Sequence, residues 1–343
     1  MPPFTLTDEL LRQILGVTES AALAAAPLLG CGDRNAVDGA AVAGMRAAFA
    51  RVPIDGIIVV GEGEKDEAPL LYTGERVGSG TGLRIDIAVD PVDGTRLAAS
   101  MRPGAIAVMS VAPRGSLFDP GPVFYLDKFV TSAIGNGLRI DAPTVDTLHE
   151  LARRLGRPVS SLRVAIQDRP RNQASADAVR SVGAEVVSFR DGDVVPALQA
   201  AHPQGAIDLL IGIGGAPEGV LTAVAVRALD GWMQARRAPQ TSAERERAEA
   251  AGLPNDQILG LDDLAAADGY FFLTAVTEVA GLDELGMEAL PGVRRVATGL
   301  ETASILVSPG GGIRRFAHLH TRAETGDTTE TDAALPGRAR TRE

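Results

Sequence analysis

Residues 90–95 (DPVDGT) combine residue types that a metal-dependent hydrolysis needs. They follow residues 83–89, where apolar side chains alternate with other residues as in a half-buried strand. Two carboxylates three residues apart, across a turn begun by proline, can point into one space, and Mg²⁺ and Mn²⁺ prefer oxygen ligands. Gly94 permits a tight turn, and the hydroxyl of Thr95 could hold a water or a phosphate oxygen. The same residue types dominate ordinary turns, so by themselves they indicate only a turn.

Further carboxylates occur after expected strands or at expected helix starts. They are Asp38, the run 62–67 with Glu62, Glu64 and Asp66, and Glu218. Each could instead be a solvated charge, and Glu218 could simply interact with a helix macrodipole. Their joint position at the ends of apolar strands favours a shared site for a divalent cation.

A glycine-rich segment, 212–219 (GIGGAPEG), lies between an expected strand and an expected helix. Such a turn can present backbone N–H groups to a phosphate. The G-x-G-x-x-G spacing fails because Pro217 follows the first glycines, which argues against a nucleotide-binding oxidoreductase. The sequence contains no Gly-x-Ser-x-Gly elbow and no credible Cys/His pair. His318 and His320 share one face of an expected terminal strand, where they could bind a metal or be ordinary surface or core residues.

Hydrophobic periodicity predicts an α/β protein with two sheet-containing domains. The first would cover residues 1–142 and carry the catalytic metal site, and the second, 143–322, would be a substrate-binding unit with a largely parallel sheet. The polar, aperiodic residues 323–343 are expected to be a disordered tail. The expected elements of the first part are helices at 7–29 and 38–51, and strands at 54–64, 83–89, 104–113 and 125–135. A polar surface helix is expected at 241–252.

Charge and composition narrow the class of protein. The net charge is -11, with 44 acidic and 33 basic residues, so the chain is not expected to bind nucleic acid. No apolar run is long enough to cross a membrane, and the single cysteine, Cys31, fits a reducing cytoplasm. Only Lys65 and Lys128 are lysines, which leaves 31 arginines among the 33 basic residues. This proportion indicates a coding bias toward arginine.

Together the motifs resemble a known family. The signature at 90–95 is similar to that of the lithium-sensitive, metal-dependent sugar and inositol phosphatases. Further segments narrow the resemblance to class II fructose-1,6-bisphosphatases, from about Val17 to about Arg322. These segments are 17–23 (VTESAAL), 32–42 (GDRNAVDGAAV), 61–75 (GEGEKDEAPLLYTGE) and 213–231 (IGGAPEGVLTAVAVRALDG).

The resemblance implies a layered sugar-phosphatase fold and hydrolysis of fructose 1,6-bisphosphate to fructose 6-phosphate, a step of gluconeogenesis. It also implies two or more Mn²⁺ or Mg²⁺ ions and a homo-oligomer, a dimer or a tetramer. The metal ligands that it implies are Asp38, Glu62, Asp90, Asp93 and Glu218. The groups that would orient or activate the attacking water are Glu64, Asp66 and Thr95. The substrate-binding residues would be Arg34, Asp93, Gly94, Thr95, Tyr125, Arg169, Pro170, Arg171, Asp191, Gly192, Asp193 and Gly215.

Two departures concern the substrate. Asp93 stands where class II members typically carry Glu, and Arg34 replaces an expected Lys. Sedoheptulose 1,7-bisphosphate or an inositol phosphate would use the same catalytic groups, so these substrates remain alternatives. A catalytically dead sugar-phosphate-binding regulator is a further alternative, although every expected metal-binding position carries Asp or Glu.

Overall fold

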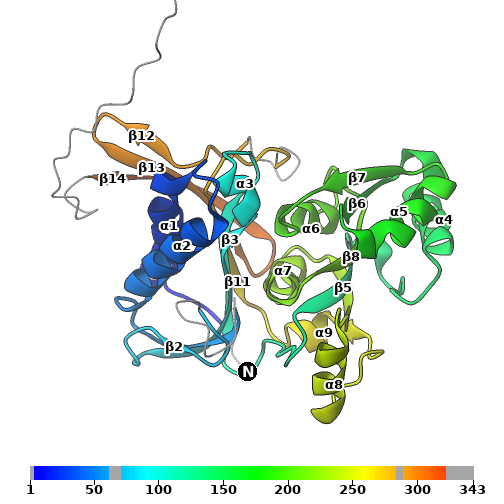
Figure 1. Cartoon of the computed structure of the whole chain (residues 1–343), viewed down its shortest axis with the longest axis horizontal. Helices are drawn as coiled ribbons and strands as arrows, with labels where there is room; N and C mark the ends of the chain where they lie inside the picture. Colours follow the sequence, from blue (N-terminus) through cyan, green and yellow to red (C-terminus); the bar gives the residue numbers. More distant parts are fainter. Residues whose placement is uncertain (1–3, 62–70, 283–288, 322–343) are drawn as a thin grey trace, which may run out of the picture.

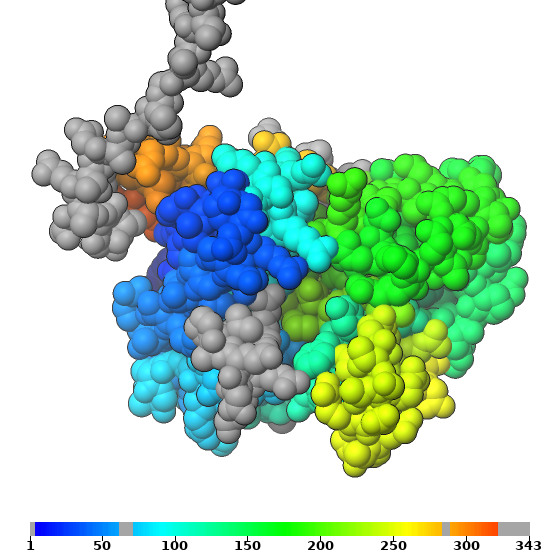
Figure 2. Space-filling view, in the orientation of Figure 1, coloured from blue at the N-terminus to red at the C-terminus, as the bar shows by residue number. Residues whose placement is uncertain are grey.

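The computed structural model describes residues 4–61, 71–282 and 289–321. Helices and sheets alternate in five layers, with helices outside and between two sheets (Figure 1). The space-filling view shows cyan residues from the first part of the chain lying against green residues that follow later in the chain (Figure 2). The outer helices of the first sheet are α1 (Asp8–Ala25) and α2 (Arg34–Phe49), the central helices are α6 (Val194–Ala201) and α7 (Ala216–Ala228), and the outer helices of the second sheet are α4 (Thr144–Leu155) and α5 (Gln173–Ser181).

The first sheet is built from both ends of the chain. Among the described residues its order is β12-β13-β11-β4-β3-β1-β2, with β14 paired to β13. Within the described ranges β1 and β3 are the only parallel neighbours, and the other pairs are antiparallel. The strands are β1 (Ile54–Val60), β2 (Arg76–Val77), β3 (Leu83–Asp93), β4 (Ile106–Pro113), β11 (Tyr270–Ala275), β12 (Arg294–Val296), β13 (Gly299–Ser308) and β14 (Gly312–Thr321).

The second sheet has the order β10-β9-β5-β8-β6-β7. β6 runs parallel to β7 and to β8, whereas β5 is antiparallel to both of its neighbours, β8 and β9. The sheet is therefore mixed rather than largely parallel, because β5 enters between two strands without a crossover helix before it. The strands are β5 (Tyr125–Thr131), β6 (Arg163–Gln167), β7 (Glu185–Phe189), β8 (Leu209–Gly215), β9 (Trp232–Arg237) and β10 (Leu259–Gly260).

The predicted fold class, an α/β protein with two sheets and helices between and outside them, is confirmed. Strand pairing does not follow the expected division at residue 142, since β5 pairs in the second sheet and β11 to β14 pair in the first. That division stays a prediction. The expected disordered tail, 323–343, lies outside the described residues.

Local signals explain the helix boundaries. Thr7 caps α1 by accepting a hydrogen bond from the backbone N–H of Leu10, as its position before the apolar pattern predicts. The polar helix expected at 241–252 forms as α8 (Ser242–Ala250), begun by a capping box of Thr241 and Glu244. The short helices are α3 (Thr95–Ala99) and α9 (Leu261–Leu264). Among the described residues, no helix is both long and apolar enough to cross a membrane.

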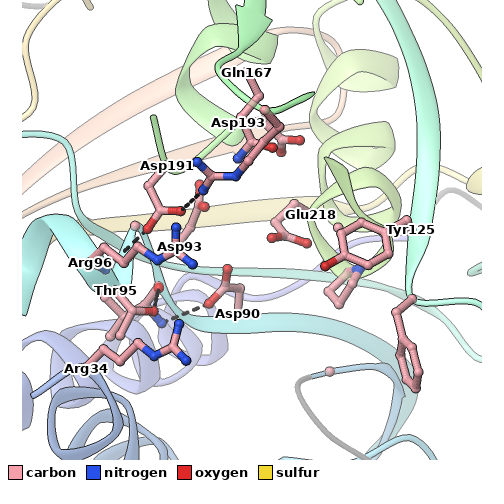
Figure 3. Close-up of a pocket in the computed structure, with 18 of the residues that line it drawn as sticks. Arg34, Asp90, Asp93, Thr95, Arg96, Tyr125, Gln167, Asp191, Asp193 and Glu218 are labelled. Carbon is pink, nitrogen blue, oxygen red and sulfur yellow. Dashed lines mark hydrogen bonds and ion pairs between the residues drawn. The ribbon is translucent and has the colours of Figure 1, made fainter. Parts of the chain in front are cut away.

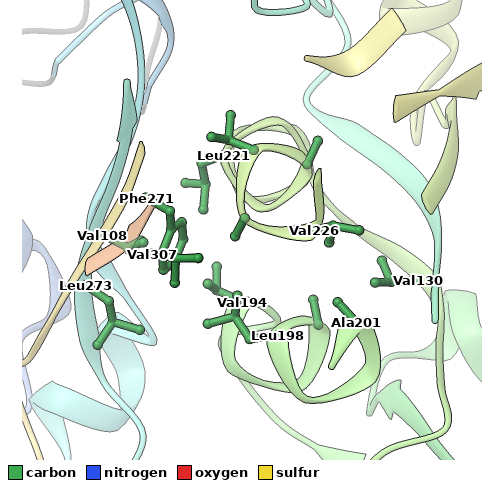
Figure 4. Close-up of a cluster of buried hydrophobic side chains, with 14 of the residues drawn as sticks. Val108, Val130, Val194, Leu198, Ala201, Leu221, Val226, Phe271, Leu273 and Val307 are labelled. Atoms are coloured by element: carbon green, nitrogen blue, oxygen red, sulfur yellow. The ribbon is translucent and has the colours of Figure 1, made fainter. Parts of the chain in front are cut away.

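The central helices are held by apolar side chains from both sheets (Figure 4). Leu221 of α7 and Leu198 of α6 are fully buried with Phe271 of the first sheet and Val130 of the second. Burying a side chain of this size stabilises the fold by about 1.5–3 kcal/mol. Because α7 is apolar on nearly every side, it is enclosed by protein. The first turns of α6 and α7 are thus held firmly between the sheets.

Candidate active site

A cavity of about 570 Å³ lies between elements of the two sheets. Residues from the end of β3, the start of β5, the segment after β7 and the first turn of α7 line it (Figure 3). It brings together thirteen of the residues that the sequence predicted: Arg34, Asp90, Asp93, Gly94, Thr95, Tyr125, Arg169, Arg171, Asp191, Gly192, Asp193, Gly215 and Glu218.

A bulge in β3 turns both aspartates toward this cavity. Asp90 pairs with Val108 of β4, and Asp93 pairs with Ile106, so three steps along β3 oppose two along β4. Residues three apart in a regular strand point to opposite faces, and the extra residue restores a common face. Pro91 fits this bulge because it has no N–H to pair with β4. The two carboxylates of DPVDGT therefore share one space for a geometric reason.

Gly94 and Thr95 complete the turn. Gly94 has φ +89°, a left-handed conformation that favours glycine, and begins α3. The hydroxyl of Thr95 donates a hydrogen bond to the carbonyl of Val92 at 2.9 Å. With its proton committed to Val92, the Thr95 oxygen can accept a hydrogen bond from a water or another donor in the cavity.

Asp90, Asp93 and Glu218 form a compact acidic group. One carboxylate oxygen from each lies within 4.8 Å of the others, and Asp90 and Asp93 are only 2% and 4% exposed. Burial raises the pKa of Asp93 well above its ordinary value, and the charges of Glu218 and Asp193 raise it further. Burial also raises the pKa of Glu218, which the charge of Lys128 opposes. A hard divalent cation would relieve this repulsion, so the donor set fits Mn²⁺ or Mg²⁺.

Arginines and one tyrosine also line the cavity. The Arg171 guanidinium lies 4.5 Å from the centre of the Tyr125 ring, and its Nε donates to the carbonyl of Ile213. Arg169 donates to Asp191 Oδ1 at 3.2 Å. Both arginines are thereby held in place with donor nitrogens left over for an anionic substrate.

Asp191 also joins the two sheets across the cavity. Its Oδ2 accepts a hydrogen bond from the backbone N–H of Arg96 at 3.2 Å, while Arg169 binds its Oδ1. Arg96 lies in the first turn of α3 beside the bulge, whereas Arg169 follows β6 of the second sheet. One carboxylate therefore links the first turn of α3 to Arg169.

Comparison with known proteins identifies the family. The family of bacterial, glpX-encoded fructose-1,6-bisphosphatases matches residues 8–320. Fructose-1,6-bisphosphatase 2 class 2 of Escherichia coli (strain K12) is 39% identical over 306 residues, which cover 85% of this chain and 92% of that protein. Fructose-1,6-bisphosphatase 1 class 2 of the same organism is 38% identical over 328 residues, covering 91% and 95%. This chain belongs to the class II fructose-1,6-bisphosphatase family. The resemblance seen in its motifs and the predicted enzyme class, a phosphoric monoester hydrolase, are confirmed.

Not every predicted residue lies in the cavity. Asp38 is on α2, one turn beyond Arg34, and belongs neither to the lining nor to the acidic group. Pro170 is exposed and lies between the two arginines without lining the cavity itself. Glu62, Glu64 and Asp66 lie outside the described residues. The roles that the resemblance assigns to these five residues stay predictions.

Three residues with polar or charged side chains in the described part of this site were missed from the sequence. Arg96 and Gln167 line the cavity, and Gln167 accepts a hydrogen bond from Arg171. Lys128 lies behind the cavity, bound to Asp193. The position of Arg96 directly after DPVDGT was a usable signal, whereas nothing local marks Gln167.

The two histidines singled out in the sequence lie elsewhere. His318 Nδ1 is 2.8 Å from the carboxylate of Glu19, and His320 hydrogen-bonds Thr302. Glu19 is 3% exposed and also accepts hydrogen bonds from Thr302 and Ser304. Within the described ranges these histidines belong to no acidic or metal-binding group of three. They serve a buried polar network between α1 and the edge of the first sheet.

Proposed function

We propose that this cavity hydrolyses the 1-phosphate of fructose 1,6-bisphosphate and releases fructose 6-phosphate and phosphate. The observation that carries the proposal is the acidic group of Asp90, Asp93 and Glu218, which lines the same cavity as Thr95, Arg169 and Arg171. A cavity that combines carboxylates able to hold a cation with arginines able to bind a phosphate suits a substrate with two phosphates.

Asp90, Asp93 and Glu218 would hold the catalytic cation, Mn²⁺ or Mg²⁺. Two or more ions are expected, with Asp38 and Glu62 as further proposed ligands. When bound, such ions neutralise the phosphoryl oxygens and lower the pKa of a bound water. Thr95 would accept a hydrogen bond from the attacking water through its free lone pair, and Glu64 and Asp66 would orient or activate that water.

The arginines would bind the second phosphate. Arg169 and Arg171 present planar sets of N–H donors that match phosphate oxygens, and Arg171 is braced by the Tyr125 ring. Asp191 and Asp193 are acceptors at the cavity wall and would take hydrogen bonds from the sugar hydroxyls. Arg34, at the start of α2, lines the same cavity and would contribute a further positive charge to it.

A phosphate-release assay tests this function. The purified chain is assayed with fructose 1,6-bisphosphate, sedoheptulose 1,7-bisphosphate and inositol 1-phosphate, each with Mn²⁺, Mg²⁺ or excess chelator. We expect cation-dependent release, fastest with fructose 1,6-bisphosphate, and an enzyme-coupled assay should identify the product as fructose 6-phosphate. Asp90→Asn is the control, and it should require far more cation. Full turnover in chelator, or release from the inositol phosphate alone, would refute the proposal.

The oligomeric state and the cellular compartment are a further part of the proposed function. We infer a homo-oligomer, a dimer or a tetramer, in the cytoplasm, as the family resemblance implies. Light scattering after size-exclusion chromatography measures the oligomeric state directly, and a monomer at micromolar concentration would refute that part.

A further inference from the structure

Lys128 is a buried lysine in a chain whose basic residues are nearly all arginines. It is one of two lysines beside 31 arginines, and its side chain is only 3% exposed in the middle of β5. A coding bias that places arginine nearly everywhere else makes this lysine informative. Its position should require a property that arginine lacks, namely a narrow stem with a compact ammonium head.

The surroundings of Lys128 show that requirement. Its Nζ lies 2.7 Å from Asp193 Oδ2. A methyl group on Gly214 would lie 3.1 Å from Nζ and would collide with Asp193, and one on Gly219 would lie 3.1 Å from Cε. The backbones of β8 and α7 therefore close around the lysine. A planar guanidinium, which is wider, would have to displace one of them.

Lys128 acts on the cavity through Asp193. The lysine does not line the cavity, but Asp193 does. Asp193 also begins α6, and the next residue, Val194, donates its N–H to Asp93 Oδ2 at 3.3 Å. Besides Asp191, which Arg169 binds, four carboxylates crowd this wall: Asp90, Asp93, Asp193 and Glu218.

We propose that Lys128 is a positioning residue that divides these four carboxylates between two tasks. By binding Asp193 Oδ2 it keeps that carboxylate out of the cation's ligand set and directs it toward the sugar. The other three, whose oxygens lie within 4.8 Å of one another, are left to hold the cation. This inference rests on the proposed role of Asp193 in sugar binding.

The direction of the expected change in cation affinity distinguishes a positioning role of Lys128 from a purely structural one. Replacing Lys128 with methionine keeps the shape of the stem, removes one positive charge near the cation site and releases one negative charge beside it. Both changes favour a divalent cation. If Lys128 had a purely structural role, its replacement would loosen its surroundings and would weaken cation binding and substrate binding together.

The experiment compares Lys128→Met with the wild type in three measurements. Mn²⁺ affinity is followed by the electron paramagnetic resonance of free Mn²⁺, KM and kcat by fructose 6-phosphate formation, and folding by Tm. We expect the Mn²⁺ Kd to be unchanged or lower, and KM to rise at least about tenfold, because a buried charge pair has lost one partner. Weaker Mn²⁺ binding with an unchanged KM would overturn the proposal.

Arg236→Met is the matched control. Arg236 binds Asp127 at 2.9 Å, and Asp127 is the neighbour of Lys128 in β5, so its side chain points to the opposite face of the sheet. We expect this variant to lower Tm while it leaves KM and Mn²⁺ affinity unchanged. If its KM rose as much as that of Lys128→Met, general loosening of the sheet would explain both, and the proposal would be wrong.

Two further variants address the possible misfolding of Lys128→Met and the requirement for a lysine at this position. If Lys128→Met folds poorly, Lys128→Met/Asp193→Asn removes the uncompensated carboxylate and should recover Tm, with Mn²⁺ affinity near wild type and KM still raised. Recovery of the wild-type KM in the double variant would contradict the role of Asp193. Lys128→Arg should also raise KM, and a wild-type KM would refute the requirement for lysine. Should the wild type not hydrolyse fructose 1,6-bisphosphate, the proposed function fails, while the Mn²⁺ measurements still test the division of carboxylates.

Discussion

Replacing Asp93 with asparagine should stabilise the metal-free protein while it impairs the enzyme. Asp93 is 4% exposed, and its oxygens lie close to those of Asp90 and Glu218. Its pKa is raised by burial and by the charge of Glu218, so ionising this group costs stability. Asparagine has nearly the same shape, and its side-chain oxygen can still accept the hydrogen bond from the N–H of Val194.

The magnitude follows from the spacing of the carboxylates. At 4.8 Å, two unit charges repel by about 3.5 kcal/mol at an effective dielectric constant of about 20. Proton uptake relieves part of this repulsion, so we expect Asp93→Asn to stabilise the chelator-treated protein by about 1–3 kcal/mol at neutral pH. That corresponds to a rise of several degrees in Tm.

The pH dependence has a definite sign. A raised pKa in the folded state means that the contribution of Asp93 to stability is complete below the unfolded value of about 3.9 and is lost as pH rises through the folded value. The advantage of asparagine should therefore vanish near pH 4 and grow toward pH 8. With Mn²⁺ present the order should reverse, because the wild type binds the ion more tightly.

Thermal melts in chelator from pH 4 to 8, and activity against Mn²⁺ concentration, test these expectations. A lower Tm for Asp93→Asn in chelator at pH 8, or an equal gain at pH 4, would refute the electrostatic reasoning. Asp93→Glu is the control that keeps the charge. A methyl group on Gly192 would lie 3.2 Å from both Asp93 oxygens, so the longer side chain has little room and should lower kcat/KM without stabilising the metal-free protein.

Three other substitutions separate catalysis, geometry and folding. Thr95→Ala should lower kcat by about 10²–10⁴-fold with an unchanged Mn²⁺ requirement, and a wild-type kcat would remove its hydroxyl from the mechanism. Gly192→Ala should weaken Mn²⁺ binding severalfold, because Gly192 has φ +74° and faces Asp93; titration with Mn²⁺ measures this, and unchanged affinity would contradict it. Glu19→Gln should lower the free energy of unfolding, measured with denaturant, by about 1–3 kcal/mol. The reason is that the glutamine side chain carries an N–H donor among groups that themselves donate hydrogen bonds to Glu19. This variant should leave kcat intact, and a loss of kcat would link that network to the cavity.

Local patterns predicted the elements well and their pairing poorly. Alternation in residues 83–89 and the polar helix at 241–252 appear in the structure as β3 and α8. Periodicity reports which face of an element is buried, and it does not report against which partner. The return of β11 to β14 to the first sheet depends on contacts such as Phe271 with Val307, and no local signal in the sequence encodes such a pairing.

The candidate site was predictable where one short segment carries it. DPVDGT (90–95) contains the bulge, the turn and the hydroxyl within six residues, so a metal-dependent hydrolysis could be inferred from it without knowledge of the fold. Lys128 acts only because β5 carries it to Asp193, 65 positions further along the chain, and Gln167 lines the cavity only because β6 pairs with β8 in the second sheet. Such roles depend on tertiary contacts.

Charge pairing separates four carboxylates of this site into two kinds, and these four are Asp93, Asp191, Asp193 and Glu218. Asp191 is bound to Arg169, and Asp193 is bound to Lys128, so each of them already has its cation within the protein. Asp93 and Glu218 form no ion pair with an arginine or a lysine of the described chain, and burial raises the pKa of both. A paired carboxylate can accept hydrogen bonds from a sugar without binding a free ion, whereas buried carboxylates without such a pair gain most from a divalent cation. The pattern of pairing therefore predicts the division between substrate and metal ligands independently of the motif.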